Sequence, residues 1–245
     1  MPVANPNYPQ AAPAGAEKVG SLRGIVIRVA LTILGLALWF WTQSLIGARP
    51  LPVGGIGDGL LIATASINQY LLENHGAANM LLIVSSAVID LLGIFLLAEW
   101  IFGRGVRPFL GLILVLGLRQ IMQALVALPA PAHTIWHYPG FPSLLVTYGV
   151  ANDYFFSGHT AIAVLGATEL VRLGKRWITA LAVVIVCFEV SAVLVLRAHY
   201  TLDVFTGILA ALYVAYLADR LSPLLDCVLR QWSGGSDNIV VAAPR

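Results

Sequence analysis

Long stretches of apolar residues, separated by short polar connections, dominate the sequence after its first twenty residues. A helix that crosses the hydrocarbon core of a bilayer needs about 20 predominantly apolar residues. Residues 59–74 instead mix leucine and isoleucine with polar residues, which predicts a helix lying on the membrane surface. The pattern therefore predicts an all-α polytopic membrane protein with six transmembrane helices, at about 24–47, 78–102, 108–129, 156–173, 178–198 and 201–221.

The segments outside these spans complete a simple domain organisation. Residues 1–20 contain several prolines among alanine and glycine, which predicts a disordered cytoplasmic tail. Residues 21–222 form the six-helix transmembrane domain, in which any active site is expected, and residues 223–245 form a cytoplasmic C-terminal tail. The connection at 130–155 contains three prolines, which disfavour regular structure there.

Composition and charge agree with a membrane protein. Hydrophobic residues make up 59% of the chain and charged residues only 11%, against about 25% in soluble domains. Of the 14 Lys and Arg residues, 11 fall on or near one side of the predicted spans, and an excess of positive charge marks the cytoplasmic side. Both termini are therefore predicted to be cytoplasmic. The 11 residues are Lys18, Arg23, Arg28, Arg104, Arg107, Arg172, Lys175, Arg176, Arg220, Arg230 and Arg245.

The histidines fall on the opposite side of these spans, together with Asp153 and Asp203. Any chemistry is therefore expected on the non-cytoplasmic face, in a bacterial inner membrane or in a Golgi or plasma membrane. Cys187 lies within a predicted span and Cys227 in the C-terminal tail, so no disulfide is expected. No Cys and His residues have zinc-binding spacing, and we expect neither a metal or other cofactor nor a nucleic-acid partner.

Two short segments, Asp153 to Thr160 and His199 to Val204, carry the candidate chemistry. In the later segment, His199 and Asp203 are four residues apart, so on a helix they share one face and can hydrogen-bond. A carboxylate in that position orients an imidazole that acts as a nucleophile or a base. In the earlier segment, Ser157, Gly158 and His159 begin an apolar stretch. If that stretch is a helix, its free N-terminal amides bind phosphate readily. Together the two segments predict a metal-independent phosphoryl-transfer site.

These motifs resemble the type-2 phosphatidic acid phosphatase superfamily, and most closely its sphingomyelin synthase branch. The resemblance covers roughly residues 24–221. Pro50-Leu51-Pro52, after the first span, also resembles that branch. The three stretches that carry the match are Leu118 to Pro131, Asp153 to Thr160 and Ala198 to Val204.

The resemblance implies a role for each of several residues. His199 would attack phosphorus and form a phosphohistidine, and Asp203 would orient it. His159 would protonate the leaving alcohol and then deprotonate the acceptor. Two departures concern the branch: Ala151-Asn152 stand where the synthases usually have Cys-Gly, and the phosphatases' Lys-x6-Arg-Pro motif is missing from the outer face. The second departure favours the synthases, because Arg107-Pro108 lies on the cytoplasmic side.

Several residues have two interpretations. Arg119, about mid-span, binds the substrate phosphate, pairs structurally with Asp90 or Glu189, or does both. Arg197 either steers a phosphate or snorkels to the interface. Asp153 either contacts substrate or caps the Ser-Gly-His turn. The predicted substrate-binding set is therefore Arg119, Ser157, Gly158, Asp153 and Arg197.

The sequence is thus interpreted as a headgroup phosphotransferase. It would move phosphocholine or phosphoethanolamine from a membrane phospholipid donor to ceramide or diacylglycerol. A lipid phosphate phosphatase or phospholipase C-like hydrolase would use the same residues with water as acceptor. A lipid transporter or scramblase would favour polar residues along a central path, whereas here they gather mostly at one face. The oligomeric state is left open, with a homo-oligomer as one alternative.

Overall fold

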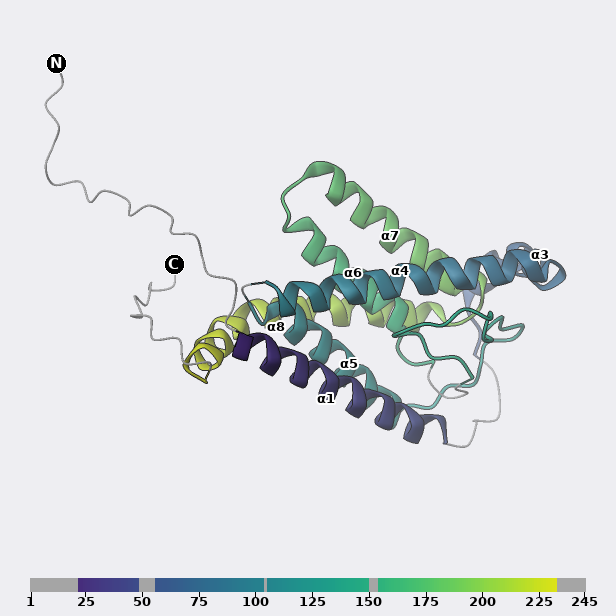
Figure 1. The fold of residues 1–245 in the computed structure, drawn as a ribbon. Helices are drawn as coiled ribbons and strands as arrows, with labels where there is room; N and C mark the ends of the chain where they lie inside the picture. The colour runs from purple at the N-terminus through teal and green to yellow at the C-terminus, as the bar shows by residue number, and fades with distance from the viewer. Residues whose placement is uncertain (1–21, 49–55, 104, 150–153, 233–245) are drawn as a thin grey trace, which may run out of the picture.

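The computed structural model describes residues 22–48, 56–103, 105–149 and 154–232. This part of the chain is helical, without strands, as predicted. Figure 1 shows a bundle of long helices, with a looped segment and two short helices gathered at one end. The helices are α1 (Leu22–Gly47), α2 (Gly59–Ala63), α3 (Ala65–Glu73), α4 (His75–Ile101), α5 (Arg107–Leu125), α6 (Gly158–Val171), α7 (Arg176–Val195) and α8 (Thr201–Trp232).

Five of the six predicted spans, all but the fourth, are helices long and apolar enough to cross a membrane, within the described residues. They are α1, α4, α5, α7 and α8. The fourth predicted span, 156–173, is the shorter helix α6, with 14 residues. Such a helix is about 21 Å long, which is less than the hydrocarbon thickness of about 30 Å. Of the six full-length spans that were predicted, the described residues therefore contain five, because α6 begins only after Ser157 and ends at Val171.

The C-terminal helix is longer than the pattern predicted. The span expected to end at 221 continues through Pro223 to Trp232. Proline inside a helix removes one hydrogen bond and bends the axis, and Figure 1 shows α8 bending toward its C-terminal end. The Asp226 carboxylate accepts a hydrogen bond from Val106 N at 2.7 Å, which fixes this extension to the start of α5. The predicted tails at 1–20 and 233–245 lie outside the described residues.

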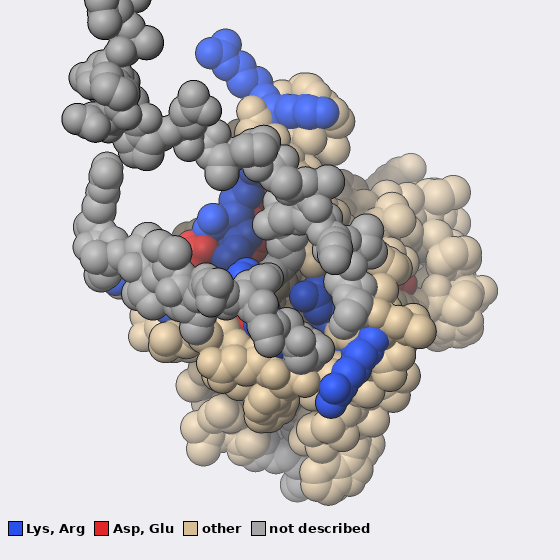
Figure 2. Space-filling view, turned by 60° about the vertical axis from the view of Figure 1, so that its left-hand side comes forward, with Lys and Arg blue, Asp and Glu red and all other residues tan. Residues whose placement is uncertain are grey.

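Charged side chains gather at the end of the bundle where α1 begins and α8 ends. Figure 2 shows Lys and Arg side chains, with acidic residues among them, on this side of the molecule. Arg107 forms ion pairs with Glu169 and with Asp219, and Arg172 pairs with Asp219. Arg28 donates to the backbone carbonyl of Trp100 at 2.6 Å. The first residue of α1 and the last residue of α8 are therefore at the same end of the bundle; the side of the membrane stays a prediction.

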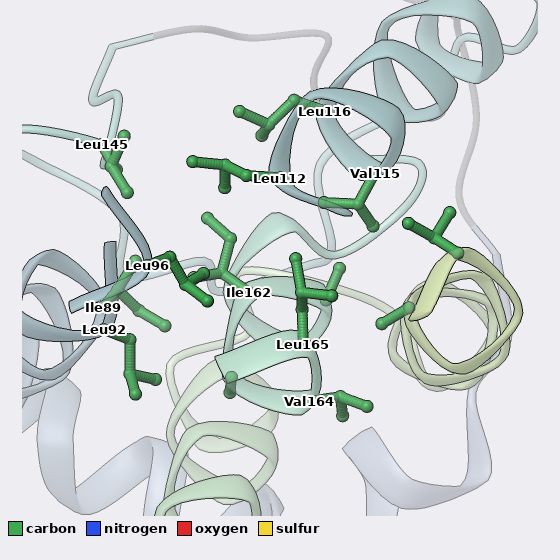
Figure 3. Close-up of a cluster of buried hydrophobic side chains, with 14 of the residues drawn as sticks. Ile89, Leu92, Leu96, Leu112, Val115, Leu116, Leu145, Ile162, Val164 and Leu165 are labelled. Carbon is green, nitrogen blue, oxygen red and sulfur yellow. The ribbon is translucent and has the colours of Figure 1, made fainter. Parts of the chain in front are cut away.

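The core surrounds α6, which packs against α4, α5, α7 and α8. Side chains from α4 and α5 meet those of α6, and Leu145 from the loop joins them (Figure 3). All residues of α6 from His159 to Gly166 are buried. The central helix therefore has no side facing lipid over its first two turns, and its N-terminus is held inside the protein.

The loop between α5 and α6 covers the end of the bundle at which α6 and α8 begin, and its described part is irregular, as the prolines predicted. Asp90, in the middle of α4, holds it. The Asp90 carboxylate accepts hydrogen bonds from Ser143 Oγ at 2.9 Å and from the backbone N–H groups of Leu144 and Leu145 at 2.8 and 2.9 Å. This intramembrane acid is therefore used to anchor the loop.

Candidate active site

The start of α6 is docked onto the first turn of α8. The Ser157 side chain caps α6 by accepting from Thr160 N at 3.3 Å, and Ser157 N donates to the Asp203 carbonyl at 3.1 Å. Gly207, one turn after Asp203, makes this approach possible, because a Cβ there would lie 2.8 Å from the Ser157 carbonyl oxygen. The two predicted motifs are thus brought together.

His199 lies before α8 rather than on it, because the helix begins at Thr201. The expectation that His199 and Asp203 share a helix face is therefore wrong in its local geometry. The Nδ1 atom of His199 is 2.7 Å from the Tyr154 carbonyl oxygen and 3.8 Å from Asp203 Oδ2. A carbonyl can only accept, so Nδ1 carries a proton, and in the neutral ring Nε2 then has the lone pair.

Asp203 is fully buried beside this imidazole. Its Oδ2 accepts a hydrogen bond from Tyr200 N at 2.9 Å, which fixes the backbone directly after His199. Its Oδ1 has no hydrogen-bond partner among the described residues. At 3.8 Å the carboxylate can stabilise a positive charge on His199 through its field, since Coulomb interactions are strong where water is excluded.

His159 is the second residue of α6, and its side chain is buried. The ring packs edge-on against Trp136, with the centroids 5.2 Å apart. Its Nε2 has no hydrogen-bond partner within the described part of the protein. A buried polar atom without a partner costs free energy, and such atoms are expected where a substrate completes the hydrogen bonding.

Arg119 reaches the same place from α5. Its Nε donates to the Phe156 carbonyl at 3.1 Å, and its Nη1 donates to Gln43 and Gln123 at 3.3 and 3.2 Å. Gly158 allows this contact, because a Cβ on Gly158 would lie 3.0 Å from Arg119 Nε. The guanidinium is therefore packed over the start of α6, where helix amides and a cation both favour an anion.

The predicted acidic partners of Arg119 are engaged elsewhere. Asp90 holds the loop, and the Glu189 carboxylate accepts from Ser85 Oγ at 2.7 Å. Three hydrogen bonds of Arg119 run instead to the Phe156 carbonyl and to the side-chain oxygens of Gln43 and Gln123. Arg119 thus links α1, α5 and the segment just before α6.

A small cavity of about 30 Å³ joins these groups. By the same measure a single water needs roughly 10–15 Å³, so the cavity has room for a few waters but not for a lipid phosphate. A lipid substrate therefore requires the lining to move apart. Its lining includes His159, His199, Arg119, Gly158, Trp136, Tyr154 and, from the loop, Leu145, Val146 and Thr147.

The other predicted binding residues lie elsewhere. Ser157 is buried as the helix cap and does not line the cavity. Arg197 donates to the carbonyls of Ala132 and Leu61 at 2.8 and 3.1 Å, which ties the loop and α2 to the end of α7. Asp153 lies outside the described residues. No three His, Cys, Asp or Glu side chains in the described ranges are placed to hold a metal ion.

Sequence reasoning missed Asp58, which fastens α2 to the start of α8. Its carboxylate accepts from Leu60 N and Leu61 N at 3.0 and 3.2 Å and so caps α2. It also accepts from Thr201 N and Thr201 Oγ1 at 2.5 and 2.6 Å, two residues after His199. Asp58 precedes a run of leucines as a helix cap does, a signal that predicts the cap but not the partner in α8.

Two comparisons place the chain among known proteins. A family model described as AtPDCT1/2 matches residues 58–220, the segment from Asp58 through most of α8. The chain is also 20% identical over 186 residues to phosphatidylcholine:diacylglycerol cholinephosphotransferase 1 of Arabidopsis thaliana. That alignment covers 76% of this chain and 59% of the Arabidopsis protein, so the chain spans less than two thirds of that protein's length.

The Asp58 contacts predict a pH-dependent stability. Burial raises the pKa of Asp58, but the hydrogen bonds from Thr201, Leu61 and Leu60 outweigh burial and lower the pKa below its ordinary value of 3.8. The stabilisation is then complete above about pH 4 and is lost as the pH falls further. Asp58→Asn should therefore lower the melting temperature at neutral pH, and the difference from wild type should shrink below about pH 4.

The measurement is thermal unfolding in detergent micelles, followed by intrinsic fluorescence across the range from about pH 3 to pH 8. Glu73→Gln is the matched control, because Glu73 accepts only an exposed hydrogen bond from Gln69 within its own helix. A difference between wild type and Asp58→Asn that stays constant over the whole range would contradict the assigned role.

Proposed function

The chain belongs to the AtPDCT1/2 family, and on that premise we propose that it is a phospholipid headgroup phosphotransferase. It moves phosphocholine, or phosphoethanolamine, from a glycerophospholipid to a lipid alcohol through a phosphohistidine on His199. The name of the Arabidopsis relative, a phosphatidylcholine:diacylglycerol cholinephosphotransferase, favours diacylglycerol over ceramide as the acceptor.

One observation carries the proposal. His159, His199 and Arg119 line the same small cavity, although they come from α6, the turn before α8, and α5. A nucleophile, a proton donor and a cation are the groups that a phosphodiester substitution needs. Their convergence at a buried site supports headgroup transfer over a structural role for the two histidines.

In the first step, the Nε2 lone pair of His199 attacks the phosphorus of the donor lipid. The bond between phosphorus and the glycerol oxygen breaks, and its electron pair goes to that oxygen. His159, in its imidazolium form, gives its proton to the oxygen, so diacylglycerol leaves neutral. The anionic phosphodiester itself favours the protonated imidazole, and Arg119 and the start of α6 stabilise the negative charge on the phosphoryl oxygens.

In the second step, the roles reverse. The hydroxyl of the acceptor lipid gives its proton to His159, now neutral, and its oxygen attacks phosphorus. The N–P bond breaks, and the electron pair returns to Nε2 of His199. Asp203 stabilises the positive charge that His199 carries while it is bonded to phosphorus, since the carboxylate lies 3.8 Å from Nδ1.

The site is placed by this proposal on the non-cytoplasmic face of the membrane. The support is the charge distribution, because most of the Lys and Arg residues belong to the opposite ends of the spans. The donor and acceptor would then be drawn from the outer or lumenal leaflet. The short helices α2 and α3 would lie at that surface, since Leu60, Ile62, Ile67 and Tyr70 are exposed on them.

The proposal predicts transfer that depends on His199. The full chain is placed in liposomes with phosphatidylcholine labelled in its headgroup and with either diacylglycerol or ceramide as acceptor. Labelled phosphatidylcholine formed on a new diacylglycerol is the expected product. His199→Ala should lower its rate by at least about 10³-fold, the scale on which loss of a covalent nucleophile acts.

His137→Ala is the matched control. His137 is also a histidine on this side of the protein, but its ring is exposed, hydrogen-bonded to Asn79 at 2.8 Å, and outside the cavity lining. It should leave the rate unchanged. Release of the headgroup to water with no transfer to either lipid would show a hydrolase. Full activity in His199→Ala would contradict transfer through a phosphohistidine on His199.

His159 is tested through the leaving group. General acid catalysis contributes about 10²–10⁴-fold, and it matters most when the leaving oxygen is basic. His159→Ala should therefore lose about that much activity on phosphatidylcholine, and less than about 10-fold on nitrophenyl phosphocholine, whose leaving group needs no proton. An equal loss on both substrates would mean that His159 is not the acid.

A further inference from the structure

A second, larger cavity lies beside the site and has no part in the chemistry described above. It is a groove of about 230 Å³ between α1 and α5, closed on one side by Leu97 of α4. Apolar side chains and helix backbone make up nearly all of its wall, including Leu36, Leu38, Phe109, Leu112 and Ile113. Leu38 and Ile113 are also exposed on the outer surface, so the α1–α5 groove borders the face that meets lipid.

The groove adjoins the histidine cavity. Trp39 and Leu116 line both spaces, and Leu116 is seen in Figure 3 among the core side chains of α5. A hydrogen-bonded amide also connects the two. Gln43 Oε1 accepts from Arg119 Nη1, in the cavity, at 3.3 Å, and from Gln120 Nε2, in the groove, at 3.1 Å. The Gln43 side chain therefore connects a lining residue of the groove, Gln120, directly to the Arg119 guanidinium.

Two buried polar atoms at this junction have no hydrogen-bond partner among the described residues. One is Trp39 Nε1, a donor; the other is Gln120 Oε1, an acceptor. Buried polar atoms are nearly always paired in folded proteins, and an unpaired one is costly. Both residues line the groove, in which the hydroxyls of Thr32 and Thr42 are already hydrogen-bonded to carbonyls of α1. The pair thus indicates a ligand with a long apolar part and, at one end, both an acceptor and a donor.

We propose that the α1–α5 groove binds the diacylglycerol moiety of the lipid substrates, with an acyl chain along the groove. Trp39 Nε1 donates to an ester carbonyl, and Gln120 Oε1 accepts from the free hydroxyl of the acceptor while it is bound, before that hydroxyl turns its proton to His159 for the transfer step. A phospholipid has no hydroxyl there, so this second bond forms only with the diacylglycerol. The inference rests on the proposed function, in which the leaving and the entering diacylglycerol use the same place because the two steps are the reverse of each other.

Gly117 offers a direct way to fill the groove. It lines the space, and a Cβ added to it would meet no atom within 4 Å. Gly117→Leu should thus occupy the groove without straining the helix, whose propensity it improves. Ala180→Leu, which adds a side chain to an exposed position of α7, is the matched control for a larger residue on the surface of the bundle.

The test measures binding rather than turnover. The full-length chain, as wild type and as His199→Ala, is placed in phosphatidylcholine liposomes that contain a diacylglycerol with a photoreactive diazirine midway along one acyl chain. After illumination, labelled peptides are mapped. Labelling of α1 and α5 at the groove is expected, and excess unlabelled diacylglycerol should suppress it. Labelling of the exposed Val183 and Val184 on α7 reports bulk lipid and should not be suppressed.

The variants sharpen the result. Gly117→Leu should lower the suppressible labelling by about 10-fold or more, while Ala180→Leu leaves it unchanged. Trp39→Phe keeps the aromatic ring but loses the donor. It should raise the diacylglycerol concentration needed for half-suppression by about 10-fold, the effect of one hydrogen bond, with no loss of thermal stability in the lipid-free protein.

The outcomes separate this inference from the proposed function. Suppressible labelling in the groove without any headgroup transfer would support the groove and overturn the phosphotransferase. Transfer without suppressible labelling, or with the same labelling in Gly117→Leu, would overturn the groove and leave the phosphotransferase standing. Labelling of the groove that resists excess diacylglycerol would mean that it holds bulk lipid only, which also contradicts the proposal.

Discussion

The first turns of α6 and α8 are hydrogen-bonded to each other, and the whole site depends on that contact. Ser157 N donates to the Asp203 carbonyl, and Gly207 keeps the space that the approach requires. The contact sets His159 and His199 on the wall of one cavity, although they are forty residues apart in the chain. Asp58 reinforces it from outside by holding Thr201.

A buried cation is the second constraint. Removing a guanidinium from water is expensive unless its donors are satisfied. Among the partners of Arg119 are the Phe156 carbonyl and two glutamine oxygens. These partners come from α1, α5 and the loop, so the position of the charge depends on how three elements pack.

The sequence predicts the helices well where the cause is local. Apolar runs of sufficient length gave α1, α4, α5, α7 and the first part of α8, within a few residues at most ends. The alternation of spans also predicted that Ser157-Gly158-His159 and His199 meet at one end. The short length of α6 was missed, because hydropathy does not show where a helix begins. The beginning of α6 is set by Ser157, which caps the helix.

The contacts that build the site could not be predicted, because the identity of a side chain does not show which distant residue or backbone atom it will meet. The Nδ1 partner of His199 is a backbone carbonyl, that of Tyr154, and any residue has one. Asp58 is hydrogen-bonded to Thr201, 143 residues away in the sequence, and Gln43 to Arg119, 76 residues away. Such contacts follow from packing alone. The pairing of Arg119 with Asp90 or Glu189 was suggested by charge and depth, but both acids have other partners.

The central claim is that Nε2 of His199 carries the headgroup, because the Tyr154 carbonyl occupies Nδ1. The direct measurement is to incubate the full chain with headgroup-labelled phosphatidylcholine, stop the reaction in alkali, which preserves N–P bonds, and identify the modified nitrogen by mass spectrometry and phosphorus NMR. The account predicts a phosphocholine group bonded through phosphorus to Nε2 of His199, which disappears when diacylglycerol is added. A label on Nδ1, on His159 or on another residue would contradict it.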